Sequence, residues 1–310
     1  MRDPKRVTLN DVAAASGVSR ATASFVLRDS PNQSISAATR ERVRQAARDL
    51  GYVPHAIARA LREGSSRIVV LSLDVALDGN YARSYVRGLD AELAAHGHTL
   101  LVRYERGTKA AAKLVLDAIA PRAVLRFGEP YLTGHELDDS GGGWRDGLAA
   151  HVSAQVGYLA GRGHTRIAYA LPDRETPLRA IRLQFADRAA EMLGLSPVAP
   201  FSIPVLRTGA AGSLADIRAA HPAVTAVAAF DDDVALRVLA AMRDLGLAAP
   251  GDLAVIGFDD NGYGELATPA LTTVHIDAEA HGRQAARAIL GLDPGDLAPA
   301  PGRVIVRESA

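Results

Sequence analysis

The sequence predicts a small all-α domain at the N-terminus, followed by a larger α/β domain with parallel sheets. Two observations predict this order. Residues 8 to 27, TLNDVAAASGVSRATASFVL, have the pattern of two short helices joined by a tight turn. From about residue 66 to residue 310, apolar runs rich in Val, Ile and Ala alternate with helical segments. Such alternation is typical of parallel strands that are covered by helices.

The first two helices form a predicted helix-turn-helix. Thr8 stands three residues before Asp11 as a capping box, and Gly17 ends the first helix. Ser19 is placed to cap a second helix, whose apolar face is Ala23, Val26 and Leu27. Four side chains in its first turns are not needed for the core: Arg20, Ala21, Thr22 and Phe25. In a recognition helix, these turns meet base edges in the major groove.

A third helix and a charge asymmetry complete the predicted domain. Ser36 opens the helix, and Gly51 and Pro54 end it. Residues 1 to 67 carry 12 Lys or Arg against 6 Asp or Glu, a net charge of +6, whereas the whole chain has 35 of each kind. Clustered Arg can be only a solvated helix face. On a helix-turn-helix domain, however, it is the charge pattern expected for binding DNA phosphates.

These residues closely resemble the DNA-binding head of the lactose-repressor (LacI/GalR) family of transcription regulators. The resemblance runs from Thr8 to Gly64, through TLNDVAAASGVS, TASFVL, TRERVRQAARDLGYVP and AIARALREG. It implies a homodimeric repressor that binds double-stranded DNA at a pseudo-palindromic operator. Arg20, Ala21 and Phe25 match base-reading positions. The positions implied near phosphates are Thr8, Ser19, Thr22 and Arg28, the last of which replaces a common Asn.

The segment from residue 54 to 65, between the head (1–53) and the rest of the chain, resembles the family's hinge helix. It is shorter than the ~12–15 residues that hold a helix alone in water. Leu61 matches the Leu that enters the minor groove and kinks the duplex. Ala58 matches a position that packs the paired hinges, and Arg59 is free to reach phosphate. The alternative is a plain linker.

Residues 66–310 give the repeating strand and helix pattern. The apolar runs are RIVVLSL, TLLVRY, AVLRFG, RIAYAL, FSIPVL, AVAAF and LAVIGF. The helical segments are Ala82–His96, Lys109–Ile119, Ala180–Leu193, Ala211–His221 and Val234–Leu245. A Gly-, Pro- and Asp-rich stretch at 128–147 interrupts this series. It leaves no room for the usual strand between Phe127 and a helix expected to start near Ala149.

By the same resemblance, this part is similar to a two-lobed periplasmic-binding-protein-like (type I) domain. The first lobe would hold about residues 66–162 and 277–300, and the second about 163–276 and 303–310. A small-molecule effector, a sugar or other metabolite, would bind in the cleft between them. The residues expected there are His151, Arg182, Asp231, Asp232 and Asp259.

The cleft departs from the family's sugar-binding pattern at several positions. Phe185 and Ala186 replace the Gly and aromatic residue that usually follow the effector-binding Arg, and Asp231 replaces Asn. Ile276 stands where Gln is common, and RTGAAG at Arg207 lacks a stacking aromatic residue. One alternative is therefore a regulator with a degenerate cleft, which is constitutive or controlled by a partner protein.

A remote alternative is a metal-dependent enzyme that uses the acids at 231–233 and at 259 and 260, because paired carboxylates can bind Mg²⁺. Acids at strand ends are also ordinary helix N-caps. The sequence has no phosphate-binding loop, no nucleophile elbow and no metal-ligand spacing among its nine His residues. We therefore expect no enzyme activity, no cofactor and no metal.

Absent features predict the compartment. The chain has no Cys, its N-terminus MRDPKRV lacks the apolar core of a signal peptide, and no apolar run approaches 18 residues. These features predict a cytoplasmic protein with no membrane partner.

Overall fold

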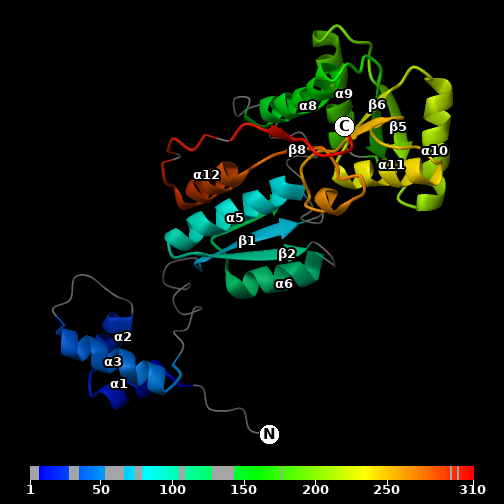
Figure 1. Ribbon diagram of the computed structural model, residues 1–310. Coiled ribbons are helices and arrows are strands. Elements are labelled where there is room, and N and C mark those ends of the chain that lie inside the picture. Colours follow the sequence, from blue (N-terminus) through cyan, green and yellow to red (C-terminus); the bar gives the residue numbers. More distant parts are fainter. Residues whose placement is uncertain are drawn as a thin grey trace. The chain divides into compact units, whose positions relative to one another are not determined.

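The computed structural model describes residues 7–27, 35–52, 66–73, 79–104, 109–127, 143–175, 177–293, 295–298 and 300–310. The chain divides into two compact units (Figure 1). One unit is Met1–Ser66 with Ala118–Ala120, and the other is Arg67–Asp117 with Pro121–Ala310. Four sequence-predicted DNA contacts lie outside the described residues: Arg28, Ala58, Arg59 and Leu61.

The head has the three predicted helices, α1 (Leu9–Ser16), α2 (Arg20–Leu27) and α3 (Ala37–Asp49). The capping box at Thr8 is confirmed, since Thr8 and Asp11 each accept from the other's backbone N–H. Gly17 ends α1 in the left-handed region, at φ 64°, which costs glycine little. The helices enclose a small core: Val12, Ala13, Ala23, Val26, Val43 and Ala47. Each of its members lies on the apolar stripe of its helix, so packing fixes which face of α2 stays outside.

The first lobe of the larger unit is a three-stranded parallel sheet with helices. Its strands are β1 (Ile68–Leu73), β2 (Thr99–Tyr104) and β3 (Ala123–Phe127), in the order β2-β1-β3. Ile68 pairs with Thr99, and Val69 pairs with Ala123. The helices are α5 (Gly79–Ala95), α6 (Lys109–Ile119) and α12 (Glu279–Leu290). In Figure 1, α5 and α12 lie side by side, and both contribute to the core around β1.

Two glycines and an ion-pair cluster join α5 to α12. A Cβ atom on Gly88 would lie 2.1 Å from the Glu279 carbonyl oxygen, and one on Gly282 would lie 2.1 Å from the Tyr85 carbonyl oxygen. Next to this close approach, the buried carboxylate of Glu92 accepts from Arg287 at 2.7 Å and from Arg283 at 3.3 Å. The two helices, which are more than 190 residues apart in sequence at this contact, therefore pack as one layer.

The second lobe is a four-stranded parallel sheet with two helices on each face. Its strands are β4 (Ile167–Pro172), β5 (Ala199–Ile203), β6 (Ala226–Ala229) and β7 (Ala254–Ile256), in the order β5-β4-β6-β7. One face packs against α8 (Gly143–Gly161) and α9 (Pro177–Met192), and the other against α10 (Arg207–Ala220) and α11 (Asp232–Asp244). Beside β7, the short strands β8 (Thr273–His275) and β9 (Arg303–Ile305) pair with each other, after a 3₁₀ turn η1 (Gly264–Leu266).

The structure differs from the sequence-based expectations in several places. Helix α8 begins at Gly143, not near Ala149, and its Val152, Val156 and Leu159 lie in the core of the second lobe. The lobe boundary expected at 162 therefore falls before α8. Strand β5 covers residues 199–203, not 201–206, because Pro204 has no N–H for a ladder. The pair β8 and β9 is antiparallel, in contrast to the parallel sheets elsewhere.

In the part of the chain that the structure describes, no helix combines the length and the apolar character needed to span a bilayer.

Substituting Gly88 tests the close contact between α5 and α12. Because the new methyl group would overlap the Glu279 carbonyl, we expect Gly88→Ala to lower the free energy of unfolding by about 1–3 kcal/mol. Gly157→Ala in α8 is the matched control, since a Cβ there meets nothing within 4 Å. We expect it to be stabilising by about 0.5–1 kcal/mol in urea denaturation, from helix propensity alone. Equal effects of the two substitutions would contradict the packing.

Candidate DNA-reading helix and inter-lobe cleft

The outer face of α2 carries the predicted base-reading side chains. Arg20 and Ala21 are exposed, and Thr22 and Phe25 are half-buried. Ser19 accepts a hydrogen bond from the Thr22 N–H at 3.0 Å and so caps the helix. Arg42 on α3 donates to the Ser16 carbonyl at 2.9 Å, which ties α3 to the end of α1. The head thus presents the N-terminal turns of one short helix on a fixed support, the arrangement needed to enter a major groove.

Arg182 on α9 is a buried cation of the second lobe. Only 4% of its surface is exposed, and its Cζ lies 3.5 Å from the ring centroid of Phe258 and 4.5 Å from that of Phe230. Its Nη1 donates to the Phe230 carbonyl, whereas Nε and Nη2 have no hydrogen-bond partner among the described residues. Burial lowers the pKa of Arg182, against the charges of nearby groups that include Asp231 and Asp259. The guanidinium is therefore oriented by two aromatic rings, with one edge unused.

Other polar groups near Arg182 are also buried without partners. The hydroxyl of Tyr169 on β4 is one of them, and burial raises its pKa. His151 on α8 has a pKa lowered by burial and by the charges of Arg182 and His281. Its ring lies close to Gly302, where a Cβ atom would be 2.1 Å from the His151 Cδ2. Three consecutive elements of the second lobe, α8, β4 and α9, thus bring basic or hydroxyl groups to one place.

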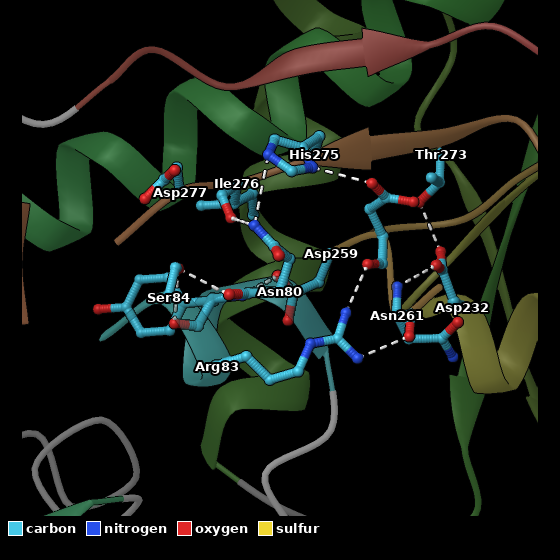
Figure 2. Close-up of polar contacts among 12 residues, drawn as sticks. Asn80, Arg83, Ser84, Asp232, Asp259, Asn261, Thr273, His275, Ile276 and Asp277 are labelled. Carbon is cyan, nitrogen blue, oxygen red and sulfur yellow. Dashed lines mark hydrogen bonds and ion pairs between the residues drawn. The ribbon is translucent and has the colours of Figure 1, made fainter. Parts of the chain in front are cut away.

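Asp232 has a structural position at the start of α11. Its side chain accepts from the Phe258 N–H and the Asn261 N–H, each at 2.8 Å, and from the Thr273 hydroxyl (Figure 2). Asp232 is 1% exposed, and burial raises its pKa to about 6 in spite of these hydrogen bonds. It holds the turn formed by residues 258–261, which we call the Asp259 turn.

The Asp259 turn has an unusual backbone. Asp259 and Asp260 both lie in the left-handed region, at φ 83° and 45°. Such conformations of non-glycine residues cost on the order of 1 kcal/mol each, and they persist only where neighbours hold them. The carboxylate of Asp260 accepts from His275 Nδ1 at 2.8 Å and from Arg307 Nη2 at 3.1 Å. Burial raises the pKa of Asp260, but these two hydrogen bonds outweigh it and leave the pKa lowered.

Every acid of the two clusters has such a partner. Asp231 caps α11 by accepting from the Val234 N–H at 2.8 Å, Asp233 pairs with Arg237, and Asp259 accepts from the Tyr81 N–H at 2.7 Å. Burial raises the pKa of both Asp231 and Asp259. In the described ranges, no group of three or more His, Asp or Glu side chains is arranged to hold a metal ion. In this geometry the acids cap helices or join neighbouring segments through hydrogen bonds and ion pairs.

Sequence reasoning missed the N-terminal turn of α5. The helix was expected from Ala82, but it begins at Gly79, and Asn80 and Arg83 reach the Asp259 turn and the end of β8 (Figure 2). The dipeptide Gly79–Asn80 ahead of the apolar pattern was the available signal. Nothing in the sequence pairs it with residues 259–276, because that pairing exists only after both lobes fold.

Asp232→Ala tests whether this carboxylate holds the turn. The substitution leaves two backbone N–H groups and a hydroxyl without their acceptor. We therefore expect the free energy of unfolding to fall by about 1–3 kcal/mol. Asp233→Ala is the adjacent control, at a side chain that is 63% exposed. It should cost less than about 1 kcal/mol in the same urea titration. An equal loss of unfolding free energy in Asp233→Ala would contradict this role of the Asp232 carboxylate.

Comparisons with known proteins agree with this geometry. Residues 8–55 match the family described as bacterial regulatory proteins of the lacI family, and residues 156–310 match the periplasmic binding protein-like domain. The HTH-type transcriptional repressor CytR of Escherichia coli K12 is 29% identical over 301 residues, 90% of this chain and 87% of CytR. The regulator CelR of Thermobifida fusca is 28% identical, over 96% of this chain and 94% of CelR.

Solved structures share the fold over nearly the whole chain. The Lac repressor dimer bound to operator and the anti-inducer ONPF aligns with a TM-score of 0.70 at 20% identity, over 98% of this chain and 99% of that one. The CelR–cellobiose complex aligns with a TM-score of 0.59 at 26% identity, over 98% and 100%. Together with the helix-turn-helix head and the two lobes, the family matches and the relatives CytR and CelR show that the chain belongs to the lacI family of bacterial regulatory proteins, as a DNA-binding transcription regulator and not an enzyme.

Proposed function

We propose that the chain is a homodimeric repressor that binds a pseudo-palindromic operator in the cytoplasm and responds to a small molecule in its inter-lobe cleft. The observation that carries the DNA-binding part is the outer face of α2, which remains outside the head's core. The observation that carries the effector part is the unused Nε and Nη2 edge of Arg182.

For DNA recognition, Arg20 is the main base-reading residue. Its exposed guanidinium at the start of α2 can pair with guanine O6 and N7, and Ala21 and Phe25 read neighbouring positions. Thr8, Ser19 and Thr22 stand near phosphates. The proposal extends to the undescribed residues Arg28, Ala58, Arg59 and Leu61, where Leu61 would enter the minor groove at the operator's centre.

For dimerisation, the first lobe offers large apolar side chains at its surface. Leu114 on α6 is 73% exposed, Val115 is 55% exposed, and Val124 on β3 is 43% exposed. Exposed apolar groups of this size commonly mark an interaction surface. A second copy of this chain is the proposed occupant, and the Lac repressor in its operator complex is a dimer.

For effector binding, Arg182 supplies two N–H donors from one edge of a planar group. A polar ligand with oxygen acceptors, such as a sugar or another metabolite, would satisfy both donors in a fixed geometry. His151 and the Asp231 and Asp259 carboxyl groups lie within electrostatic reach of Arg182. Asp232 would act indirectly, by holding the turn that carries Asp259. The CelR–cellobiose complex, which shares this fold, supports a small-molecule ligand for this chain.

Selection of DNA from a random pool tests the head. We expect the full-length chain to enrich a palindromic sequence, and Arg20→Ala to lose about 1–3 kcal/mol of discrimination between that sequence and a base-substituted one. Arg48→Ala is the control, because Arg48 pairs with Glu41 on α3. No enriched sequence, or an Arg20→Ala variant that discriminates as well as the parent, would overturn the assignment.

Thermal shift in the presence of metabolites tests the cleft. A ligand that binds the folded chain raises its melting temperature. We expect Arg182→Met, which replaces the buried guanidinium with an apolar chain of similar length, to stay folded and to lose this shift. The exposed Arg188→Met on the same helix should keep it. A parent protein whose melting temperature no metabolite changes would instead favour a cleft without an effector.

A further inference from the structure

The N-terminal turn of α5, in the first lobe, grips the Asp259 turn of the second lobe directly. We propose that this contact is a latch that closes the cleft in the absence of any effector, with Asp259 taking a place that a ligand would otherwise fill. This proposal goes beyond the function proposed above, because it concerns the ligand-free chain and holds whether or not an effector exists.

The backbone of α5 makes the central part of the latch. The Asn80 N–H donates to the Asp259 carbonyl at 2.7 Å, and the Tyr81 N–H donates to the Asp259 Oδ1 at 2.7 Å. The first N–H groups of a helix have no partner within the helix, and they favour a negative group. Asp259 satisfies two of them from the opposite lobe. The chain thereby supplies its own acceptor where an oxygen-rich ligand would have to bind.

Gly79 makes this approach sterically feasible. It lies at φ 84°, and a Cβ atom there would be 1.9 Å from the Asp259 Oδ2. Any larger residue would therefore push the carboxylate away from α5. Glycine at the first position of α5 therefore leaves room for the Asp259 side chain of the second lobe.

Two side chains of α5 add hydrogen bonds to residues on both sides of Asp259. Arg83 donates to the carbonyls of Asn261 at 2.8 Å and Asp260 at 3.1 Å (Figure 2). Asn80 donates through Nδ2 to the Ile276 carbonyl at 2.8 Å and lies 3.3 Å from His275 Nε2.

The ring of His275 connects Asn80 to the Asp259 turn through hydrogen bonds at its two nitrogens. Because Asn80 offers N–H groups, His275 Nε2 acts as the acceptor, and Nδ1 donates to Asp260 at 2.8 Å. The two ends of the turn are therefore connected to α5 through separate sets of hydrogen bonds.

The turn that α5 grips is itself held in place. Its left-handed residues are fixed from within the second lobe by Asp232, Thr273 and Arg307. A preorganised turn loses little conformational freedom when α5 binds it, so more of the hydrogen-bond energy goes to holding the lobes together. A ligand that needs the Asp259 carboxylate must first displace α5. The free energy needed to break the latch is therefore subtracted from the free energy of effector binding.

Distance measurement between two spin labels tests the latch in the full-length chain without ligand. The chain has no Cys, so Ala94→Cys on α5 and Arg188→Cys on α9 give one label in each lobe, both at exposed positions. Labelled chain is diluted into an excess of unlabelled chain, which suppresses distances between copies. We expect a single narrow distance distribution for this background, because the latch keeps the lobes closed.

Two variants in that background decide the question. Gly79→Ala combined with Arg83→Ala pushes the Asp259 carboxylate away from α5 and removes the Arg83 contacts, so it should shift the distribution to longer, broader distances. Arg87→Ala, one turn along α5, is the matched control, because Arg87 pairs with Glu279 within the first lobe. It should keep the narrow distribution. A broad distribution in the background itself, or an unchanged one in the double variant, would overturn the proposal.

Discussion

The structure of the cleft depends on one buried carboxylate, that of Asp232. It accepts from two backbone N–H groups and a hydroxyl, and it joins the start of α11, the Asp259 turn and β8. These bonds hold the backbone on both sides of Asp259 and Asp260, whose left-handed conformations need such support. Burying an ionised carboxyl group is costly, as the pKa of about 6 for Asp232 indicates. The hydrogen bonds offset that cost and place Asp259 where α5 can reach it.

A displacement of the Asp259 turn can be transmitted through the first lobe, because α5 and α12 form one rigid layer. Helices α5 and α12 approach so closely at Gly88 and Gly282 that neither can slide past the other without separation. The ion pairs of Glu92 with Arg283 and Arg287 add a second contact next to these glycines. Release of the Asp259 turn would therefore act on both helices together. In sequence, β1 is the first described strand after the three helices of the head, so this lobe is the one that follows the head in the chain.

Arg182 shows how the cleft differs from an ordinary polar pocket. Two aromatic rings pack against its guanidinium, and the carbonyl of Phe230 accepts a hydrogen bond from one of its nitrogens. The nearby carboxyl groups of Asp231 and Asp259 are turned to helix N-termini, so they contribute charge without a direct ion pair to Arg182. A ligand at its free edge would gain two hydrogen bonds in a site shielded from water, where such bonds are strong.

The sequence by itself determined the head, because the signals at Thr8, Gly17, Ser19 and Ser36 act over three or four residues. It also determined the alternation of strands and helices, since apolar periodicity is local. It could not determine that α8 packs in the second lobe, or that β8 and β9 pair antiparallel, because both depend on partners far along the chain. The candidate acids were predicted as a group, but their roles were decided only by tertiary structure. Hydrogen bonds such as those from α5 to Asp259 join residues about 180 apart, and no local pattern encodes the distance between them.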